Sequence, residues 1–504
     1  MKRRLLILTF HAPPSAEVAA KPTAALATRL AQRGWEVVMV VPELEFVLQR
    51  DEAAFDRFDP RIVLVRAAVG FHHSLVLVRL RQLQNRLKGR PAGLADLLNQ
   101  AAASYQTRLE SNSPPTSPRV KVTDAHVSTF ARIPSWRVKL RDSLRYPYGI
   151  FSGWVGPAAR AAIRLHREQP FDVMVSISPP HIVQMAALRV KRRVPNLPWV
   201  MQWHDPWTLN PFRSWSLTWL NRWEERDERA ALAAADLVLL ATAEAAQRHH
   251  NHFPGLARFQ GLELGFDPDL FETPAPTTVL DFNDPSGPLI ITHAGTLYGH
   301  RDPSALFDAL ALLVSRGELG PNDLRVRFLG DCRSIGGRSV EDLARSRGVA
   351  PWVELIGTVP HRQALDAQAQ SDALLLLAEN QPDQIPAKVF EALHLRRPTL
   401  ALCDGASARL VAETGIGPVF HSGQVEAIAA TLRDWLQRRR QGRPLLDQPS
   451  RAEAIAHYHL DQVAARFEAA LEETIQRVSN GQRPHHAQVT PPNSPSDHPA
   501  SFIP

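Results

Sequence analysis

The chain has 504 residues, of which 44% are hydrophobic and 22% are charged, so most of it can bury a core and a wholly disordered protein is excluded. The length suggests about two to three domains. Lys and Arg outnumber Asp and Glu by 58 to 51, and this formal charge of +7 is too small for so long a chain to indicate nucleic-acid binding. Two cysteines, Cys332 and Cys403, exclude a disulfide framework and suit a reducing compartment.

The amino terminus has some features of a secretory signal but predicts a buried strand instead. Basic residues precede the apolar run from Leu5 to Phe10, which ends at His11 and is followed by two prolines without a cleavage pattern. Elsewhere no apolar run approaches the roughly 18 residues of a membrane span. We therefore expect a cytoplasmic protein.

In the first half, short apolar runs alternate with amphipathic stretches, a pattern typical of a parallel sheet covered by helices. Strands are predicted at 5–10, 37–41, 62–65, 173–177, 199–203 and 237–241, and helices at 19–33, 182–193 and 217–234. Between about 66 and 135 the pattern loosens into a basic insertion. Basic residues gather from Leu75 to Arg90 and again from Arg132 to Arg145.

The alternation begins anew after residues 272–288, which are rich in Pro, Thr, Asp and Asn and are predicted to form a linker. Strands are predicted at 289–293, 325–329, 353–356, 373–377 and 399–402, and helices at 303–315, 340–347, 362–369, 388–395 and 425–437. A last amphipathic helix is predicted over 452–477, and the proline-rich residues 479–504 predict disorder. The chain is therefore expected to be α/β, with two doubly wound domains, 1–271 and 289–450, facing across a cleft, followed by a helix at 451–478.

Several common motifs are absent from the sequence. No predicted strand is followed by GxGxxG or GxxxxGK[ST], and neither HExxH nor GxSxG occurs, so dehydrogenase and P-loop functions lose their usual support. The acid pair Asp267 and Asp269 stands in a Gly-Phe-Asp-Pro setting, which favours a turn over a metal site.

The most informative segment runs from Asp383 to Glu391. It places two carboxylates eight residues apart, with Pro386 at a predicted helix start and Lys388 in the first turn. A helix amino terminus that follows a parallel strand offers free amides and a positive dipole to a phosphate. Lys388 adds a full charge, and Glu391 can accept hydrogen bonds from a ribose diol. Taken alone, the segment also fits an ordinary capped helix with a solvated acid.

This segment resembles the acid-x7-acid signature of family 4 glycosyltransferases of the GT-B fold, with Asp383 where that family usually has Glu. Other segments resemble the family in the same order: 202–207 (QWHDPW), 265–267 (GFD), 293–301 (HAGTLYGHR), 330–331 (GD), 357–360 (GTVP) and 392–402. Two departures stand out. Thr296 replaces a cation of the glycine loop, and the loop after the first strand, 11–16, contains no glycine.

The resemblance implies two Rossmann-like domains, with the acceptor on the first and a nucleoside-diphosphate sugar on the second. It implies the following roles: Arg301, Lys388, Gly295 and Thr296 hold the donor diphosphate; Glu391, Gly357 and Val359 hold the ribose and base; Asp383, Glu391 and His204 serve the chemistry; His11 and Asp205 lie on the acceptor side. No metal ligands and no cofactor are implied, and nucleic acid is not an expected partner.

The implied reaction moves a sugar, with retention, from the nucleoside-diphosphate donor to a sugar or lipid-linked acceptor in bacterial-type polysaccharide or glycoconjugate synthesis. Two alternatives remain open. An epimerase or hydrolase with this fold would consume a nucleotide sugar without an acceptor, and a non-catalytic homologue would only bind a nucleotide sugar or a partner.

The two basic segments, from Leu75 to Arg90 and from Arg132 to Arg145, also have two interpretations. One is a solvated, arginine-rich helical surface. The other is contact with an anionic membrane surface, which would make the protein peripherally membrane-associated.

Overall fold

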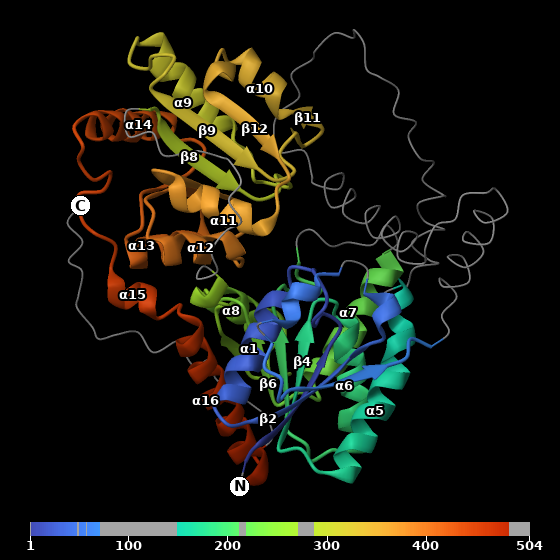
Figure 1. The fold of residues 1–504 in the computed structure, drawn as a ribbon. Helices are drawn as coiled ribbons and strands as arrows, with labels where there is room; N and C mark the ends of the chain where they lie inside the picture. The colour runs from blue at the N-terminus through green and yellow to red at the C-terminus, as the bar shows by residue number, and fades with distance from the viewer. Residues whose placement is uncertain are drawn as a thin grey trace, which may run out of the picture.

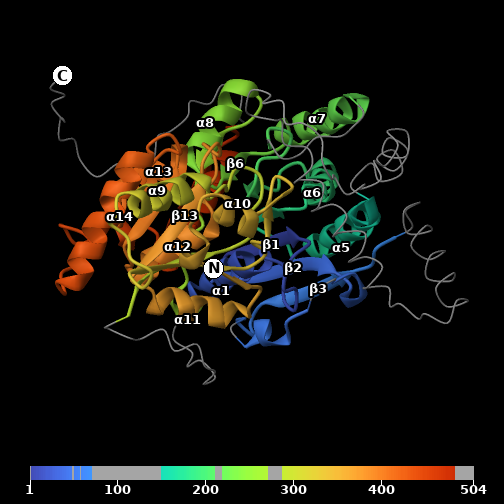
Figure 2. The same ribbon diagram turned by 90° about the horizontal axis from the view of Figure 1, so that it is seen from above.

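The computed structural model describes residues 2–47, 50–56, 58–70, 149–210, 218–270 and 287–482. They form two α/β domains, one above the other in Figure 1 and seen from above in Figure 2. Both basic segments, almost all of the predicted linker and the predicted disordered tail from residue 483 onward lie outside the described residues. Among the residues described, no helix combines the length and apolarity needed to cross a bilayer.

The first domain contains a parallel sheet whose described strands run in the order β3-β2-β1-β4-β5-β6-β7. The strands are β1 (Arg4–Thr9), β2 (Glu36–Pro42), β3 (Val63–Ala67), β4 (Val173–Ser178), β5 (Trp199–Trp203), β6 (Leu237–Leu240) and β7 (Phe259–Gly261). The helices are α1 (Ala20–Gln32), α5 (Val155–Glu168), α6 (Ile182–Arg193), α7 (Thr218–Leu232) and α8 (Ala243–His252). The predicted strands and helices of this half are confirmed, whereas β7, α5 and α8 were not predicted.

Strand β1 shows why these strands are continuous apolar runs. Leu6 and Leu8 pack in a core with α5 and α6, while Leu5 and Ile7 pack in another core on the opposite face. All four side chains are at most 1% exposed. A parallel sheet covered on both faces has no polar side, so its strands do not alternate between apolar and polar residues.

The second domain contains a parallel sheet whose described strands run in the order β12-β9-β8-β13-β14-β15. The strands are β8 (Leu289–Ala294), β9 (Leu324–Leu329), β12 (Val353–Gly357), β13 (Ala373–Ala378), β14 (Thr399–Cys403) and β15 (Val419–Phe420), with a small ribbon of β10 (Ser334–Ile335) and β11 (Arg338–Ser339). The helices are α9 (Ser304–Ser315), α10 (Val340–Ser346), α11 (His361–Gln370), α12 (Ala387–Leu395), α13 (Gly405–Thr414) and α14 (Val425–Arg440). Again the predicted elements are confirmed, and α13 and β15 are additional.

In both sheets the strand order reverses once near the middle, between β1 and β4 and between β8 and β13. Open α/β sheets bind ligands outside the carboxyl ends of their strands at such a reversal. The loops that follow the strands of the two sheets contact each other, because the Thr242 hydroxyl after β6 donates to the Asp383 carbonyl after β13 at 2.7 Å. The ligand-binding edges of the two sheets therefore face one another.

The carboxy-terminal helix differs from the sequence prediction. Instead of one helix over 452–477, the structure has α15 (Ala452–Ala456) and α16 (Leu460–Ser479). His459 is extended between them, and its ring accepts a hydrogen bond from the Asp461 amide, which starts a new helix. The break lets the chain cross back to the first domain, where Phe467 and Leu471 of α16 are buried against the sheet (Figure 1).

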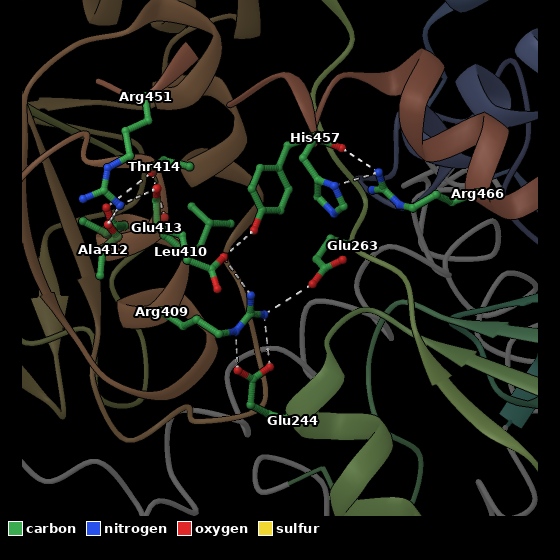
Figure 3. A network of polar contacts seen from close by, with 12 residues as sticks. Glu244, Glu263, Arg409, Leu410, Ala412, Glu413, Thr414, Arg451, His457 and Arg466 are labelled. Carbon is green, nitrogen blue, oxygen red and sulfur yellow. Dashed lines mark hydrogen bonds and ion pairs between the residues drawn. The ribbon is translucent and has the colours of Figure 1, made fainter. Parts of the chain in front are cut away.

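Arg409 of α13 joins the two domains near this crossing (Figure 3). Its guanidinium lies 2.7 Å from Glu244 of α8, 3.3 Å from Glu263 after β7 and 3.1 Å from Glu413 of its own helix. Burial alone would lower the pKa of Arg409, but the three carboxylates raise it above its ordinary value. The Arg409 guanidinium therefore stays protonated, and its ion pairs link the first domain to the second. We name this group of four residues the Arg409 clamp.

We predict that Arg409→Ala lowers the free energy of unfolding by about 1–3 kcal/mol, because three partly buried carboxylates lose a charged hydrogen-bond donor. Arg164→Ala serves as the control, since its side chain is 67% exposed and its carboxylate partner lies 3.8 Å away on the same helix. Scanning calorimetry of both variants measures the difference. Equal shifts in Tm for the two variants would show that the clamp adds nothing to stability.

Candidate active site

The candidate site is built where the two domains meet, around the amino terminus of α12. Pro386 precedes the helix, which begins at Ala387. Its first amides have no acceptor within the helix and carry partial positive charge. The loop before it is held by Asp404, whose carboxylate accepts from the Asn380 and Gln381 amides at 2.7 and 3.3 Å. These contacts hold the start of the loop, whose later residues Asp383 and Gln384 contact the first domain.

Gly405 has to be glycine for this loop to keep its place. Its φ of +52° is left-handed, and a Cβ there would come within 2.3 Å of the Pro382 backbone. The start of α13 can therefore approach the loop between β13 and α12 only because residue 405 has no side chain.

Glu391 and Lys388 lie one turn apart on α12 and form an ion pair, with the Lys388 Nζ 2.8 Å from Oε1 and 3.0 Å from Oε2. Two residues of α11 complete the surroundings of the carboxylate: the Gln368 amide donates at 2.8 Å and His361 lies at 3.4 Å. Burial alone would raise the pKa of Glu391, but His361, Lys388 and Gln368 together lower it to about 2. Glu391 is therefore an ionised acceptor at neutral pH.

Asp383 has a partner that the sequence analysis did not name. Its side chain is 10% exposed and forms an ion pair with Arg248 of α8, in the first domain. The implied role, acceptance of a donor-sugar hydroxyl, would require the carboxylate to share or exchange this guanidinium. The acid-x7-acid pair thus holds one cation from each domain, Arg248 on Asp383 and Lys388 on Glu391.

The glycine loop after β8 lies beside the loop after β9. The Gly295 amide donates to the Leu329 carbonyl at 2.8 Å, and a Cβ at Gly330 would stand 2.2 Å from the Gly295 oxygen. Only glycine at 330, where φ is +118°, permits this approach. Thr296 is exposed at the tip of the loop.

Arg301 closes the glycine loop and is oriented by an aromatic ring. Its guanidinium carbon lies 4.3 Å from the Tyr298 ring centroid, a cation–π distance. The Arg301 Nε is buried and has no hydrogen-bond partner among the described residues. The pKa of Asp205, after β5 in the first domain, is raised above its ordinary value, because the effect of burial outweighs the opposing charge of Arg301. Arg301 thus acts electrostatically across the interface.

Gly357 and Val359, assigned by resemblance to the base site, follow the edge strand β12. Val359 packs with Ala294 and Leu329, beside the glycine loop. The same loop leads directly into α11, whose His361 and Gln368 contact Glu391. The structure therefore connects Val359, the glycine loop and Glu391 through one helix.

His293, at the end of β8, is a residue that the sequence analysis did not assign to the site. Its Nδ1 lies 3.1 Å from the Leu375 carbonyl, which fixes the proton on Nδ1. Its Nε2 is buried, carries a lone pair, and has no hydrogen-bond partner among the described residues. Burial, together with the charges of Arg301 and Lys388, lowers the pKa of His293 to about 4. This neutral imidazole lines a cavity of about 30 Å³ with Pro386 and Lys388, large enough for one water molecule.

The first domain contributes His11, after β1, and His204 and Asp205, after β5. Burial lowers the pKa of His11 to about 4, and burial together with the nearby His11 lowers that of His204 to about 4. Both imidazoles are therefore neutral at pH 7. Asp205 lies 3.5 Å from Gln384 of the loop before α12. Asp205 thus lies beside the loop that runs from Asp383 to the start of α12.

Besides His293, sequence reasoning missed four residues of this site: Arg248, Tyr298, His361 and Gln368. Tyr298 lies inside the glycine loop and His361 directly follows residues 357–360, so both lie in or next to segments that the sequence analysis identified. Arg248 and Gln368 lie on helices with no local signal. The Asp267 and Asp269 carboxylates accept hydrogen bonds from Arg29 of α1 at 3.2 and 2.7 Å. The turn that the sequence predicted here is confirmed.

Residues 281–453 match the family described as "Glycosyl transferases group 1". No curated protein matches the chain. Among solved structures, sucrose-phosphate synthase from Thermosynechococcus elongatus is 12% identical over 94% of this chain and 100% of that chain, with a TM-score of 0.56. Anabaena HepE in complex with UDP and glucose is 12% identical over 93% and 99%, with a TM-score of 0.55. Trehalose 6-phosphate synthase from Burkholderia multivorans is 11% identical over 96% and 99%, with a TM-score of 0.55.

The chain therefore has the GT-B fold, and its second domain is similar to group 1 glycosyl transferases. The expected fold and the expected resemblance to GT-B glycosyltransferases are both confirmed, and the assignment to family 4 stays a prediction.

Two half-buried histidines of the first domain predict a pH dependence of stability. His11 and His204 have pKa values of about 4 in the folded protein, below the ordinary value of about 6.5 that applies in the unfolded chain. Between these values the unfolded chain binds more protons, so stability is full above about pH 6.5 and falls as pH drops toward 4. We expect His11→Asn/His204→Asn to lose part of this fall, on the order of 1 kcal/mol per histidine.

Urea unfolding between pH 7.5 and 4 tests this prediction. His421→Asn is the matched control, because the His421 side chain is 63% exposed. If the double variant kept the full slope of the wild type, the two imidazoles would not be the groups that charge on unfolding.

Proposed function

We propose that the protein transfers a sugar, with retention, from a nucleoside-diphosphate donor to an acceptor hydroxyl. The observation that carries the proposal is that the charges of Arg301 and Lys388 both act on the buried His293 at the end of β8. Lys388 lies in the first turn of α12 and pairs with Glu391 there, at the β8–β13 reversal of a domain that matches group 1 glycosyl transferases. This is where an open α/β sheet binds its ligand.

The leaving diphosphate is stabilised by fixed positive charge. Arg301, oriented by Tyr298, comes from the loop after β8, Lys388 comes from the first turn of α12, and the helix dipole adds to them. Preorganised charges of this kind stabilise the transition state because they need no reorganisation when the bond breaks. With these cations in place, the proposal invokes no metal ion.

The nucleoside is held by Glu391 and by the Gly357–Val359 loop. A carboxylate with a pKa of about 2 is ionised and accepts hydrogen bonds from a ribose diol. Lys388 shares Glu391 with the ribose and, as the diphosphate binds, turns its remaining donors to phosphate oxygens. We propose uridine as the base, because HepE, with the same fold, is described in complex with UDP.

Asp383 and His204 orient the donor sugar from opposite domains. Neutral His204 serves as a hydrogen-bond partner rather than as a cation. Asp383 accepts a sugar hydroxyl in place of part of its contact with Arg248. His11 and Asp205 border the acceptor, for which we propose a sugar or lipid-linked sugar of the kind used in polysaccharide or glycoconjugate synthesis.

In the reaction, the bond between the anomeric carbon and the diphosphate oxygen breaks, and a bond to the acceptor oxygen forms on the same face. The acceptor proton passes to the leaving diphosphate, so no protein nucleophile is needed. The chain's own residues position the two substrates and hold the diphosphate charge.

Incubation with a panel of nucleotide sugars, with and without acceptors, tests the proposal. Mass spectrometry and proton NMR of the products distinguish the three functions. We expect acceptor-dependent release of nucleoside diphosphate and a product with the donor's anomeric configuration. Acceptor-independent consumption of the donor would indicate an epimerase or hydrolase, and binding without turnover would indicate a non-catalytic protein.

We predict that Arg301→Ala and Glu391→Ala each lower kcat/KM for the nucleotide sugar by about 100-fold or more, the usual cost of a lost transition-state contact. Arg345→Ala is the control, because its side chain is 62% exposed and pairs only within α10. Steady-state release of nucleoside diphosphate gives the rates. Undiminished turnover in both cleft variants would overturn the assignment of this site.

A second pair of variants separates the roles of Asp383. Both Asp383→Asn and Arg248→Ala remove the ion pair between the domains, but only the first removes the acceptor proposed for the donor sugar. We therefore expect Asp383→Asn to lower kcat at least about 10-fold more than Arg248→Ala. Equal losses of kcat in the two variants would mean that Asp383 serves only the contact between the domains.

A further inference from the structure

A second cavity lies in the second domain, away from the interdomain site. It has a volume of about 650 Å³ and is bordered by Arg396–Pro398 after α12, by the end of α14 and by the loop 442–450. Asp372 and Pro398 also line it, and they immediately precede β13 and β14. The cavity is therefore at the amino ends of these strands, at the opposite edge of the sheet from Asp383. We name it the arginine groove.

The groove is lined by four arginines and two aspartates: Arg396, Arg397, Arg439, Arg443, Asp372 and Asp447. Both aspartates already have partners. Asp372 pairs with Arg439 at 2.6 Å, and Asp447 pairs at 2.6 Å with Arg438, which does not line the groove.

Three guanidinium groups remain after these pairs. No carboxylate of the described residues forms an ion pair with Arg396, Arg397 or Arg443, although Arg397 donates to the Ala369 carbonyl. The lining therefore carries positive charge that the described part of the protein does not neutralise.

The end of α14 does not account for this charge. Cations stabilise the last turn of a helix, and α14 has Arg438, Arg439 and Arg440 there, each already paired with a carboxylate. Arg443 lies three residues beyond the end of α14, where the dipole effect has faded. Arg396 is the C-cap of α12, where the dipole favours a cation, whereas Arg443 comes from the segment after α14. The cavity therefore gathers arginines from two separate segments of the chain.

The chemistry of the lining indicates the class of ligand. Guanidinium groups bind phosphate oxygens in bidentate geometry, and they do so better than any other side chain. Ile416, Pro398 and Leu445 add apolar surface to the same cavity. The volume falls in the range of small-molecule sites, about 300–1,000 Å³. These features suit a phosphate group carried on a small organic molecule.

We propose that the arginine groove is a second anion site of this domain, which binds the phosphate of a small phosphorylated molecule outside the interdomain site. Arg396 and Arg443 hold the phosphate, and Arg397 supports them from the rim. This site is independent of the glycosyl-transfer proposal, because it shares no residue with the interdomain site.

Calorimetric titration with pyrophosphate, at fixed ionic strength and with the full chain, tests the proposal. The wild type is expected to bind two pyrophosphates. Arg396→Ala/Arg443→Ala should retain only the interdomain site, and Arg301→Ala/Lys388→Ala should retain only the groove. Within the Arg301→Ala/Lys388→Ala background, adding Arg396→Ala/Arg443→Ala should weaken the remaining binding at least 10-fold.

Arg316→Ala/Arg345→Ala, in the same background, is the charge-matched control, since both arginines lie on the same domain but outside both sites. Circular dichroism confirms that each variant is folded. The proposal is overturned if the groove variant binds as the background does, or if the control weakens binding equally. Failure of the interdomain site alone would leave binding to the groove intact, so the two proposals fail separately.

Discussion

The placement of a buried carboxylate on α12 is the constraint on which the candidate site depends. Glu391 stays ionised inside the protein only because Lys388, His361 and Gln368 surround it. Two of these partners lie on α11 and one lies a turn earlier on α12, so satisfying the charge fixes the two helices against each other. The same arrangement turns the amino terminus of α12, and with it Lys388, toward the loop that holds Arg301.

The strands were predictable because both faces of each sheet are buried, which makes parallel strands short continuous apolar runs. β7 and β15 were missed because they have three and two residues. α8 was missed because its sequence, rich in Gln, His and Asn, shows little apolar stripe. The break at 457–459 was missed because the amphipathic pattern continues through it, while the reason for the break is tertiary: the Phe266 backbone pairs with Tyr458 and Leu460.

The sequence pointed to those parts of the candidate site that consist of residues close together in the chain. Residues 383–391 combine acids, proline and lysine within a helix start, and residues 293–301 form a glycine loop. The partners of these residues were not predictable, since they are distant in the chain: Arg248 lies 135 residues from Asp383. Such a contact also changes the meaning of the motif. Asp383 lies in the second domain and, through Arg248, contacts the first. If Asp383 holds the donor sugar as proposed, donor binding and domain position are coupled at this carboxylate.

The central claim is that a nucleoside diphosphate binds between Arg301 and the start of α12. The most direct test is calorimetric titration of UDP into the wild type and into Lys388→Ala. The account predicts one UDP per wild-type chain, with an affinity that falls as salt rises, and at least 10-fold weaker binding to the variant. Absence of UDP binding to the wild type, or equal affinity for the two proteins, would contradict it.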